Sequence, residues 1–499
     1  MAERRDVVPP DEVKGGAMDQ LDLVIILAAG EGTRMKSATP KVLHPIAGKP
    51  ILDHVIRATS GLGAAETRIV VGAGRELVEA FIKREYPTAA IVHQAERNGT
   101  GHATQLALEN GPQIGSVLIL AGDTPLLTQE TLNEFFAAHN ELGASASVLT
   151  SFVPDPFGYG RIVRSVDGAI EKIVEERDAT EDEKEIYEIN TGVYLFDIES
   201  LRSGVAGLKS GNAQGELYLT DVISLIKLAG GKVEAIASDD FTETLGINDR
   251  SQLADCVALM RDRINEAHMK NGVTIIDPTT TWIDVDIEIN RDVTIHPGSA
   301  ISGTSRIASG AVIGPRSTLR SVVVGEGASI VESVVSESAV GVAASVGPFS
   351  FIRPGTTVAD HAKVGAYVEV KNSYIGEGSK VPHLSYVGDA QIGSGTNIGA
   401  ATIFVNYDGV EKHSTVVGND VRVGSDTMLV APVKIGDGAY TAAGSVITED
   451  VPAGAIGVAR AKQRNVLGWV LRKRAGSKSA EAAKRAGAVE SPTTAQGEA

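Results

Sequence analysis

The chain has 499 residues, enough for about three domains, and its 43% hydrophobic and 22% charged residues are ordinary for a globular protein. Its formal net charge of −17 excludes nucleic acid and anionic membranes as general partners, because neither would be attracted. The single cysteine, Cys256, excludes an internal disulfide framework and fits a reducing compartment. The N-terminus has no apolar segment typical of a secretory signal, so we expect a cytoplasmic protein.

The N-terminal half has the pattern of an α/β domain. Residues 1–20 are polar and rich in proline and glycine, so we expect a flexible tail. From residue 21 to 250, continuous apolar runs alternate with amphipathic stretches. The runs predict buried strands at 23–28, 68–71, 89–93 and 117–121, and the stretches predict helices at 51–59, 75–86, 100–109 and 129–140. This alternation predicts a mostly parallel, Rossmann-like sheet with helices on both faces.

A six-residue repeat occupies most of the C-terminal half. Residues 251–272 carry apolar side chains at helical spacing and predict a single linker helix. From residue 273 to 458, aliphatic residues recur every six positions, starting with the series Ile295, Ile301, Ile307, Ile313 and Leu319. The 55 glycines and the aromatic content of 4% suit a tightly turning backbone. The period predicts a parallel β-helix.

Two stretches interrupt the repeat, and a distinct segment follows it. Residues 383–386 and 402–414 break the period, and such insertions into a solenoid often lie on its binding face. Residues 459–474 are basic and include Trp469. They either reach a ligand or a neighbouring chain, or form an exposed helix. Residues 475–499, rich in Ala, Ser and Lys, are expected to be a disordered tail.

The first predicted strand ends in a glycine-rich loop. Gly30 and Gly32 let the backbone close on an anion, so that exposed N–H groups can bind phosphate oxygens. Arg34 and Lys41 would supply positive charge. Met35 stands where a dinucleotide-binding fingerprint has its third glycine, so the loop does not match that motif. The alternative is an ordinary strand-to-helix turn that needs glycine.

Asp123 follows the strand predicted at 117–121. Open α/β sheets bind ligands at the carboxyl ends of their strands, and a carboxylate there can hold Mg²⁺ together with substrate phosphates. The alternative role of Asp123 is to cap the helix after Pro125. Taken together, the two strand ends predict a site for a nucleoside triphosphate and a metal ion.

Both halves resemble a known family. The sequence contains Leu27-Ala28-Ala29-Gly30-x-Gly32-Thr33-Arg34-Met35 followed by Pro40-Lys41, which is similar to the signature of sugar-phosphate nucleotidylyltransferases. With the C-terminal repeats, residues from about 21 to 469 resemble the bacterial bifunctional N-acetylglucosamine-1-phosphate uridylyltransferase/glucosamine-1-phosphate N-acetyltransferase family. The resemblance implies a nucleotidylyltransferase domain at 21–250, and an acetyltransferase domain at 273–458 that folds as a left-handed parallel β-helix of hexapeptide repeats.

The resemblance also implies a UTP and UDP-sugar site in the N-terminal domain. Its residues are Leu27, Ala28, Ala29, Gly30, Arg34, Lys41, Gln94, Gly99, Thr100, Ala121, Gly122, Asp123, Gly160, Glu175, Asn190 and Asn248. Of these, Asp123 and Asn248 match the family's Mg²⁺ ligands. The resemblance further implies that Gly160, Glu175 and Asn190 contact the sugar, and that the uridine nucleotide is contacted by Ala28, Ala29, Gly30, Lys41, Gln94, Gly99 and Thr100. Without the resemblance, Gly160 would be interpreted as part of a hairpin turn and Asn190 as a solvated strand residue. Ala121 departs from the family pattern, in which a tyrosine often precedes Gly-Asp, but the metal carboxylate is intact.

A second site is implied in the β-helix. Acetyl transfer to a sugar amine needs a base that titrates near neutral pH, and His383 matches the family's catalytic histidine. The residues implied for the sugar phosphate are Arg353, Lys371, Tyr386 and Asn397. The residues implied for acetyl-CoA are Ala400, Asn406, Tyr407, Ser425, Ala443 and Arg460. Ala401 replaces a glycine common in the family. Without the resemblance, Arg353 and Lys371 are charges on a solvated face.

The resemblance implies an enzyme that makes UDP-N-acetylglucosamine, a cell-wall precursor. Glucosamine-1-phosphate is acetylated from acetyl-CoA, and N-acetylglucosamine-1-phosphate then reacts with UTP in the presence of Mg²⁺. The chain resembles solenoid acyltransferases that form trimers, with each active site between neighbouring β-helices. The resemblance therefore implies a homotrimer. Two alternatives remain: a nucleotidylyltransferase whose β-helix is only a scaffold, and an inactive nucleotide sensor.

Overall fold

The first part of the chain folds around a mixed β-sheet. The computed structural model describes residues 21–72 and 75–489, so the tail predicted at 1–20 lies outside the described residues. The chain divides into two compact units between Glu326 and Gly327. In the described part of the chain, no helix is both long and apolar enough to cross a membrane.

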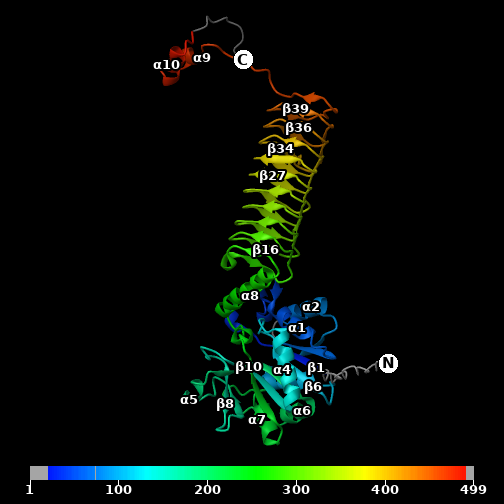
Figure 1. Cartoon of the computed structure of the whole chain (residues 1–499), viewed down its shortest axis with the longest axis vertical. Helices are drawn as coiled ribbons and strands as arrows, with labels where there is room; N and C mark the ends of the chain where they lie inside the picture. Colours follow the sequence, from blue (N-terminus) through cyan, green and yellow to red (C-terminus); the bar gives the residue numbers. More distant parts are fainter. Residues whose placement is uncertain (1–20, 73–74, 490–499) are drawn as a thin grey trace, which may run out of the picture. The chain divides into compact units, whose positions relative to one another are not determined.

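The sheet of the first unit is mostly parallel, as predicted, but contains an antiparallel insertion (Figure 1). Its strands are β1 (Leu23–Ala28), β4 (Glu66–Val71), β5 (Ala90–His93), β6 (Ser116–Ala121), β7 (Ala146–Phe152), β8 (Gly160–Arg164), β9 (Ile170–Val174), β10 (Glu188–Asp197) and β11 (Val233–Ala237). Their order is β11-β7-β10-β6-β1-β4-β5, with β8 and β9 beside β10. Strand β10 is antiparallel to β6, β7 and β8, whereas β1 is parallel to β4 and β6.

Helices cover both faces of this sheet. They are α1 (Ile51–Ser60), α2 (Arg75–Glu85), α3 (Thr100–Leu108), α4 (Gln129–Leu142), α5 (Glu181–Lys184), α6 (Ile198–Ala206) and α7 (Asp221–Leu228). Because side chains alternate along a strand, Val24 and Ile26 of β1 face a core shared with α1, α2 and α4. Leu23 and Ile25 face a second core shared with α3, α6 and α7. The predicted three-layer arrangement is therefore confirmed.

Short elements after β1 and a long helix after β11 surround the end of the sheet. The short elements are the 3₁₀ helices η1 (Thr33–Met35), η2 (Lys41–Leu43) and η3 (Phe241–Thr244), and the strands β2 (Pro45–Ile46) and β3 (Lys49–Pro50). Helix α8 (Arg250–Lys270) closely matches the predicted linker helix. The Asp249 side chain caps it by accepting hydrogen bonds from the backbone N–H groups of Ser251 and Gln252.

The repeats begin in the first unit as stacked coils. Their elements are β12 (Thr274–Ile275), η4 (Pro278–Thr280), β13 (Trp282–Ile283), β14 (Glu288–Ile289), β15 (Thr294–Ile295), β16 (Ala300–Ser302), β17 (Arg306–Ile307), β18 (Val312–Ile313), β19 (Thr318–Arg320) and β20 (Val323–Val324). Each strand pairs in parallel with the third strand after it, so that Ile295 lies over Ile313. Three strands thus make one coil, as a hexapeptide β-helix requires.

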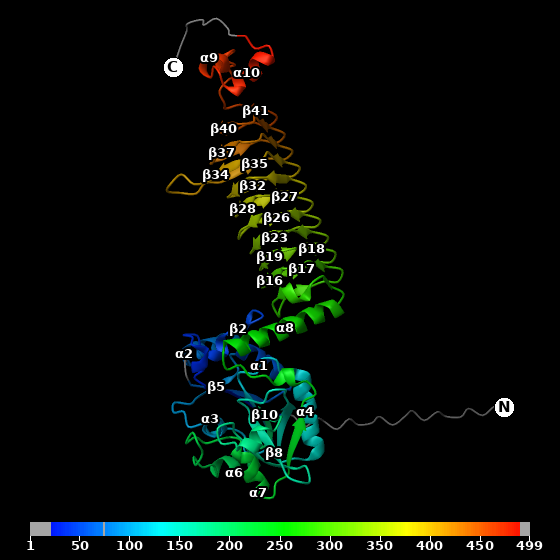
Figure 2. The same ribbon diagram turned by 90° about the vertical axis from the view of Figure 1, so that its left-hand side faces the viewer.

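The second unit continues the same pattern on three faces (Figure 2). One face contains β21 (Ser329–Ile330), β24 (Ser345–Val346), β27 (Lys363–Ala366), β30 (Lys380–His383), β33 (Asn397–Ile398), β36 (Arg422–Val423), β39 (Tyr440–Thr441) and β41 (Ile456–Gly457). A second contains β22 (Val334–Ser336), β25 (Phe351–Ile352), β28 (Glu369–Lys371), β31 (Tyr386–Gly388), β34 (Ile403–Val405), β37 (Met428–Val430) and β40 (Val446–Ile447). The third contains β23 (Ala339–Val340), β26 (Thr357–Val358), β29 (Tyr374–Ile375), β32 (Ala390–Ile392), β35 (Thr415–Val417) and β38 (Val433–Ile435).

Buried hydroxyl groups at the corners satisfy backbone carbonyls inside the solenoid. Ser350 donates to the carbonyl of Gly365 over 2.5 Å, Ser379 to that of Gly393 over 2.6 Å, and Thr396 to that of Gly418 over 2.8 Å. A buried carbonyl without a partner would cost free energy, so these side chains stabilise the turns between coils.

The C-terminal segment corrects one expectation. Residues 475–499 were expected to be disordered, but the structure has helix α10 (Lys478–Arg485) there, after the short helix α9 (Trp469–Lys473). The Ser477 side chain caps α10 by accepting from the N–H of Ala480. Its Ala, Lys and Glu residues are strong helix formers that also make a sequence look low in complexity. Residues 490–499 lie outside the described part.

Candidate functional site

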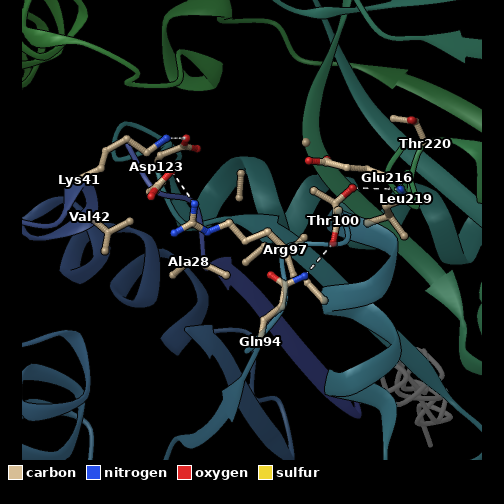
Figure 3. A pocket seen from close by; sticks show the side chains of 18 of the residues that line it. Ala28, Lys41, Val42, Gln94, Arg97, Thr100, Asp123, Glu216, Leu219 and Thr220 are labelled. Carbon is tan, nitrogen blue, oxygen red and sulfur yellow. Dashed lines mark hydrogen bonds and ion pairs between the residues drawn. The ribbon is translucent and has the colours of Figure 1, made fainter. Parts of the chain in front are cut away.

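A cavity of about 430 Å³ lies where β1, β5 and β6 end in the first unit (Figure 3). Strand β10 and the segment before α7 complete its wall. Twelve of the predicted nucleotide and sugar residues line it: Leu27, Ala28, Ala29, Gly30, Lys41, Gln94, Gly99, Thr100, Ala121, Asp123, Glu175 and Asn190. Residues from six separate stretches of the sequence thus meet at the sheet edge where open α/β folds bind ligands.

Four predicted residues do not line this cavity. Gly122 follows Ala121 directly, and its N–H donates to the carbonyl of Leu27. Gly160 starts β8, where an added Cβ would lie 3.4 Å from the Cβ of Asn190. Arg34 lies in η1 with an exposed side chain. Asn248 precedes α8 and is half-buried.

Lys41 and Asp123 form an ion pair inside the cavity. The two side chains come from η2 and from the loop after β6. Gly32, with φ of 62°, packs against Lys41, and an added Cβ there would lie only 2.6 Å from the Lys41 Cβ. Glycine is therefore needed where the phosphate loop approaches the lysine. Asp123 does not cap the following helix, because the Thr128 side chain caps α4.

Asp123 and Asn248 fit a magnesium ion. The backbone N–H of Ile247 donates to the Asp123 carbonyl over 3.0 Å, which brings the segment containing Asn248 beside the Asp123 loop. The described residues contain no cluster of three or more His, Cys, Asp or Glu side chains that could hold a metal alone. One carboxylate and one amide oxygen leave positions for substrate phosphates and water, which is the coordination Mg²⁺ favours.

Glu175 and Asn190 line the part of the cavity assigned to the sugar. Burial raises the pKa of Glu175, and nearby acids raise it further, although a hydrogen bond from the Thr220 hydroxyl over 3.2 Å opposes the rise. The Asn190 amide donates to the Tyr194 hydroxyl over 2.7 Å, and its oxygen accepts from the N–H of Gly192. These two hydrogen bonds orient the Asn190 side chain, which is half-buried.

Gln94, Gly99 and Thr100 form the wall predicted for the uridine. The Gln94 side chain donates to the Gly99 carbonyl over 3.0 Å, so it bridges the loop between β5 and α3. The Thr100 hydroxyl accepts from the backbone N–H of Leu219 over 3.0 Å, which ties this loop to the segment before α7.

Several lining residues were not predicted. They are Glu31, Val42, Arg97, Ala103, Gly192, Tyr194, Glu216, Leu219 and Thr220. Glu31 lies in the glycine-rich loop and Arg97 lies between Gln94 and Gly99, but neither residue type in the sequence showed that the two side chains meet. Glu216, Leu219 and Thr220 lie far from any motif, so no sequence signal identified them.

The second unit places the predicted sugar-phosphate residues on adjoining coils. Arg353 donates to Glu369 over 2.8 Å, and Glu369 lies directly below Tyr386 in the next coil. The Lys371 ammonium lies 3.7 Å from the Asp389 carboxylate, which also accepts from the Asn406 side chain over 2.5 Å. Figure 2 shows the loop that carries Asn406 and Tyr407 projecting beside β34.

Lys412 adds a positive charge that the sequence analysis missed. It lies in the loop between β34 and β35, where a bridge between Tyr407 and Lys412 closes a short hairpin. Contact with Lys371 and repulsion from its charge lower the pKa of Lys412. Two ammonium groups this close are suited to an anion such as a sugar phosphate.

His383 and the predicted acetyl-CoA residues lie along successive coils. His383 ends β30 with an exposed side chain, and its carbonyl accepts from the N–H of Ala401. An added Cβ on Gly399 would lie 2.4 Å from the Ser425 nitrogen, and one on Gly424 would lie 2.5 Å from the Ala443 nitrogen. The corners that hold Ala400, Ser425 and Ala443 are therefore stacked. Asn397 starts β33, and Arg460 is exposed after β41.

Comparison with known proteins finds relatives over almost the whole chain. Residues 24–181 match the family model of the MobA-like NTP transferase domain, and residues 334–435 match that of the GMPPB C-terminal domain. The bifunctional protein GlmU of Streptomyces avermitilis is 52% identical over 463 residues, covering 92% of this chain and 96% of that protein. Those of Kineococcus radiotolerans and Mycobacterium tuberculosis are 51% and 49% identical, over 95% and 94% of this chain and 96% and 97% of theirs. The chain therefore belongs to the GlmU family of bifunctional N-acetylglucosamine-1-phosphate uridylyltransferase/glucosamine-1-phosphate N-acetyltransferases.

Proposed function

We propose that the chain makes UDP-N-acetylglucosamine in two steps at two separate sites. Residues 273–458 are assigned to acetyl transfer from acetyl-CoA to glucosamine-1-phosphate. Residues 21–250 are assigned to uridylyl transfer from UTP to the acetylated product, with 251–272 as the linker. The observation that carries the proposal is the similarity to bifunctional GlmU proteins over more than nine-tenths of the chain; the cavity lined by twelve of the predicted nucleotide and sugar residues supports it.

In the acetyl-transfer step, His383 acts as the general base. The sugar amine loses a proton to the imidazole and attacks the thioester carbonyl, forming a C–N bond while the C–S bond breaks. The imidazolium returns the proton to the departing thiolate, so CoA leaves as the thiol. Arg353 and Lys371 bind the sugar phosphate, and Tyr386 and Asn397 orient the ring. Asn406, Tyr407, Ala400, Ser425, Ala443 and Arg460 bind the acetyl donor. Ser425 also stabilises the tetrahedral oxyanion.

In the uridylyl-transfer step, a phosphate oxygen of N-acetylglucosamine-1-phosphate attacks the α-phosphorus of UTP. A new P–O bond forms as the bond to the β-phosphate breaks, and pyrophosphate leaves. The attacking oxygen is already ionised at neutral pH, so no base is needed. Catalysis then rests on positioning and on charge neutralisation by Lys41 and Arg34. The family's nucleotidyl-transfer chemistry needs a metal ion; we assign Mg²⁺, held by Asp123 and Asn248, as additional countercharge.

The remaining assignments concern the assembly and its surroundings. We propose a homotrimer in the cytoplasm, without nucleic-acid or membrane partners. The net charge of −17 supports the last point, because it repels other polyanions.

Following free thiol and pyrophosphate separately tests the two steps. With glucosamine-1-phosphate, acetyl-CoA, UTP and Mg²⁺, wild type should release thiol without UTP and pyrophosphate once UTP is added. Asp123→Asn should abolish pyrophosphate release and leave thiol release intact. His383→Ala should abolish thiol release, but it should still release pyrophosphate when N-acetylglucosamine-1-phosphate is supplied with UTP. Loss of both signals in Asp123→Asn, or of pyrophosphate release from supplied N-acetylglucosamine-1-phosphate in His383→Ala, would contradict separate sites. If wild type released pyrophosphate only when N-acetylglucosamine-1-phosphate was supplied, the β-helix would be a scaffold without acetyltransferase activity.

A further inference from the structure

We propose that Arg97 binds the β- and γ-phosphates of UTP and the departing pyrophosphate, and that Glu31 holds its guanidinium in place while no phosphate is bound. The inference rests on the uridylyl transfer proposed above and adds a catalytic residue to it. Neither residue was part of the site predicted from the sequence.

The two side chains meet inside the nucleotide cavity. Glu31 lies between Gly30 and Gly32 in the phosphate loop after β1, and Arg97 lies in the loop between β5 and α3. Both line the cavity, and the Arg97 guanidinium lies 2.5 Å from the Glu31 carboxylate. In Figure 3, the Arg97 side chain runs from the Gln94 and Thr100 wall toward Asp123 and Lys41. Its charge therefore lies between the wall assigned to the uridine and the assigned metal carboxylate.

This ion pair is poorly placed to stabilise the fold. The Arg97 and Glu31 side chains are 54% and 48% exposed, and both belong to loops. Exposed pairs contribute little to stability, because water screens the charges and two long side chains must be ordered. A binding role explains its position inside the cavity better than a structural one.

Arg97 supplies positive charge that a triphosphate bound in this cavity would require. Among its lining residues, only Lys41 and Arg97 are cationic, and Lys41 is already paired with Asp123. Arg34, the other arginine assigned to the phosphates, is exposed and does not line the cavity. A triphosphate carries several negative charges, and a guanidinium can bind two of its oxygens at once.

We expect the Arg97 guanidinium to have two alternative partners, which are the Glu31 carboxylate without a ligand and the phosphate oxygens with one. A carboxylate beside an anion-binding loop repels phosphate, and in the structure Arg97 neutralises it. When a triphosphate enters, its oxygens compete with Glu31 for the same guanidinium. As the bond between the α- and β-phosphates breaks, negative charge grows on the departing oxygen, and Arg97 is placed to stabilise it. Removing Arg97 and removing the Glu31 charge should therefore have opposite effects.

The test compares Arg97→Met, Arg97→Lys and Glu31→Gln. Arg97→Met should raise the KM for UTP, and the KM for pyrophosphate in the reverse reaction, about tenfold. It should change the KM for N-acetylglucosamine-1-phosphate less than twofold. Arg97→Lys should fall between wild type and Arg97→Met. Glu31→Gln should lower the pyrophosphate KM about twofold to threefold, because the phosphate no longer competes with a carboxylate.

Arg75→Met is the matched control. Arg75 is exposed and lines a smaller cavity beside Arg97 but not the nucleotide cavity, so the loss of its charge should leave these constants unchanged. Shifts of the same sign in Arg97→Met and Glu31→Gln, or none in Arg97→Met, would overturn the proposal. If wild type released no pyrophosphate from UTP, the proposed function would fail separately. Calorimetric titration of pyrophosphate with Mg²⁺ into the same variants would still decide the role of Arg97.

Discussion

Glu175 shows how its surroundings set the chemistry of a single carboxyl group. Its side chain lines the nucleotide cavity beside the strand that carries Asn190. Burial is the largest influence and raises its pKa above the usual 4.5, and Asp178 and Asp221 add to the rise. The Thr220 hydroxyl donates to the carboxylate and limits the shift.

This raised pKa predicts a pH-dependent sugar affinity. The ionised carboxylate accepts hydrogen bonds from sugar hydroxyls better than the neutral acid, which must itself donate one. We therefore expect the KM for N-acetylglucosamine-1-phosphate to rise as the pH is lowered from about pH 8 through the raised pKa of Glu175. Glu175→Gln should have a higher KM at pH 8 and a flatter profile. Since the substrate phosphate also titrates, the difference between the two profiles is the measurement. Parallel profiles would contradict this role.

Ala401 is a residue whose backbone does not suit its side chain. Its φ of 61° lies in the left-handed region, at the corner between β33 and β34. An L-residue there costs about 1–2 kcal/mol, whereas glycine adopts the conformation freely. The departure from the family's glycine is therefore a local strain in the acetyltransferase half.

Ala401→Gly should stabilise the β-helix. The relief of strain exceeds the extra entropy that glycine adds to the unfolded chain, so the free energy of unfolding should rise by about 0.5–1 kcal/mol. Chemical denaturation followed by circular dichroism measures this change. Ala442→Gly is the control, since Ala442 lies at a corner where the backbone is not left-handed. The Ala442→Gly variant should lose about 0.5–1 kcal/mol of unfolding free energy. Destabilisation by both variants would show that Ala401 is not strained.

At the scale of elements, a charged cluster joins the first coil of the repeats to α1 and the β2–β3 hairpin. Arg57 of α1 donates to both carboxylate oxygens of Asp286, over 2.7 and 3.1 Å. The Lys49 ammonium lies 2.8 Å from the same carboxylate. Arg57 also pairs with the buried Asp53 over 2.6 Å. Beside the cluster, the N–H of Val285 donates to the carbonyl of Ala47. All of these residues lie within the first unit.

Removing the Asp286 charge should weaken this junction. Partial burial favours the neutral acid, but the ion pairs with Lys49 and Arg57 outweigh it and lower the pKa of Asp286. A carboxyl whose pKa is lower in the folded state stabilises above its unfolded value and loses that effect as the pH falls through the folded pKa. Asp286→Asn should therefore lose about 1 kcal/mol of unfolding free energy at pH 7. The loss should shrink below about pH 4.

Glu288→Gln is the matched control for Asp286→Asn. Glu288 lies two residues further on and pairs with Arg306 over 3.2 Å, but both side chains are about two-thirds exposed. Its loss should change stability by less than about 0.5 kcal/mol. An equal loss in both variants would mean that the cluster around Asp286 does not act as a network.

The elements that sequence patterns predicted best are those with strong local signals. Strand β1 was predicted to the residue, and the six-residue period identified the β-helix, because burial of one face imposes that spacing. The antiparallel strand β10 was not predicted, since pairing direction depends on distant partners. Helix α10 was missed because its composition suggested disorder. Arg97 and Lys412 were missed because side chains from different loops meet only after folding.

At the scale of the whole molecule, apolar side chains on the surface of the second unit are relevant to the association of several copies of the chain. It exposes many large apolar side chains, including Phe349, Phe351, Tyr367, Tyr374 and Leu384. Phe349 and Tyr367 stack with their ring centroids 5.3 Å apart. An exposed pair of stacked aromatic rings is suited to contact with another molecule. His383, next to Leu384, is itself exposed.

An exposed base is a poor arrangement for acyl transfer, because an open site gives water access to the thioester. A neighbouring β-helix would cover His383 and complete the site. We therefore expect acetyl transfer, but not uridylyl transfer, to depend on assembly. Serial dilution that dissociates the proposed trimer, followed by sedimentation velocity, should lower the thiol released per chain in step with the loss of that trimer. Pyrophosphate release per chain should stay constant, because the nucleotide cavity lies within the first unit, and so serves as the internal control. Undiminished thiol release from a monomer would show that one chain holds a complete acetyltransferase site.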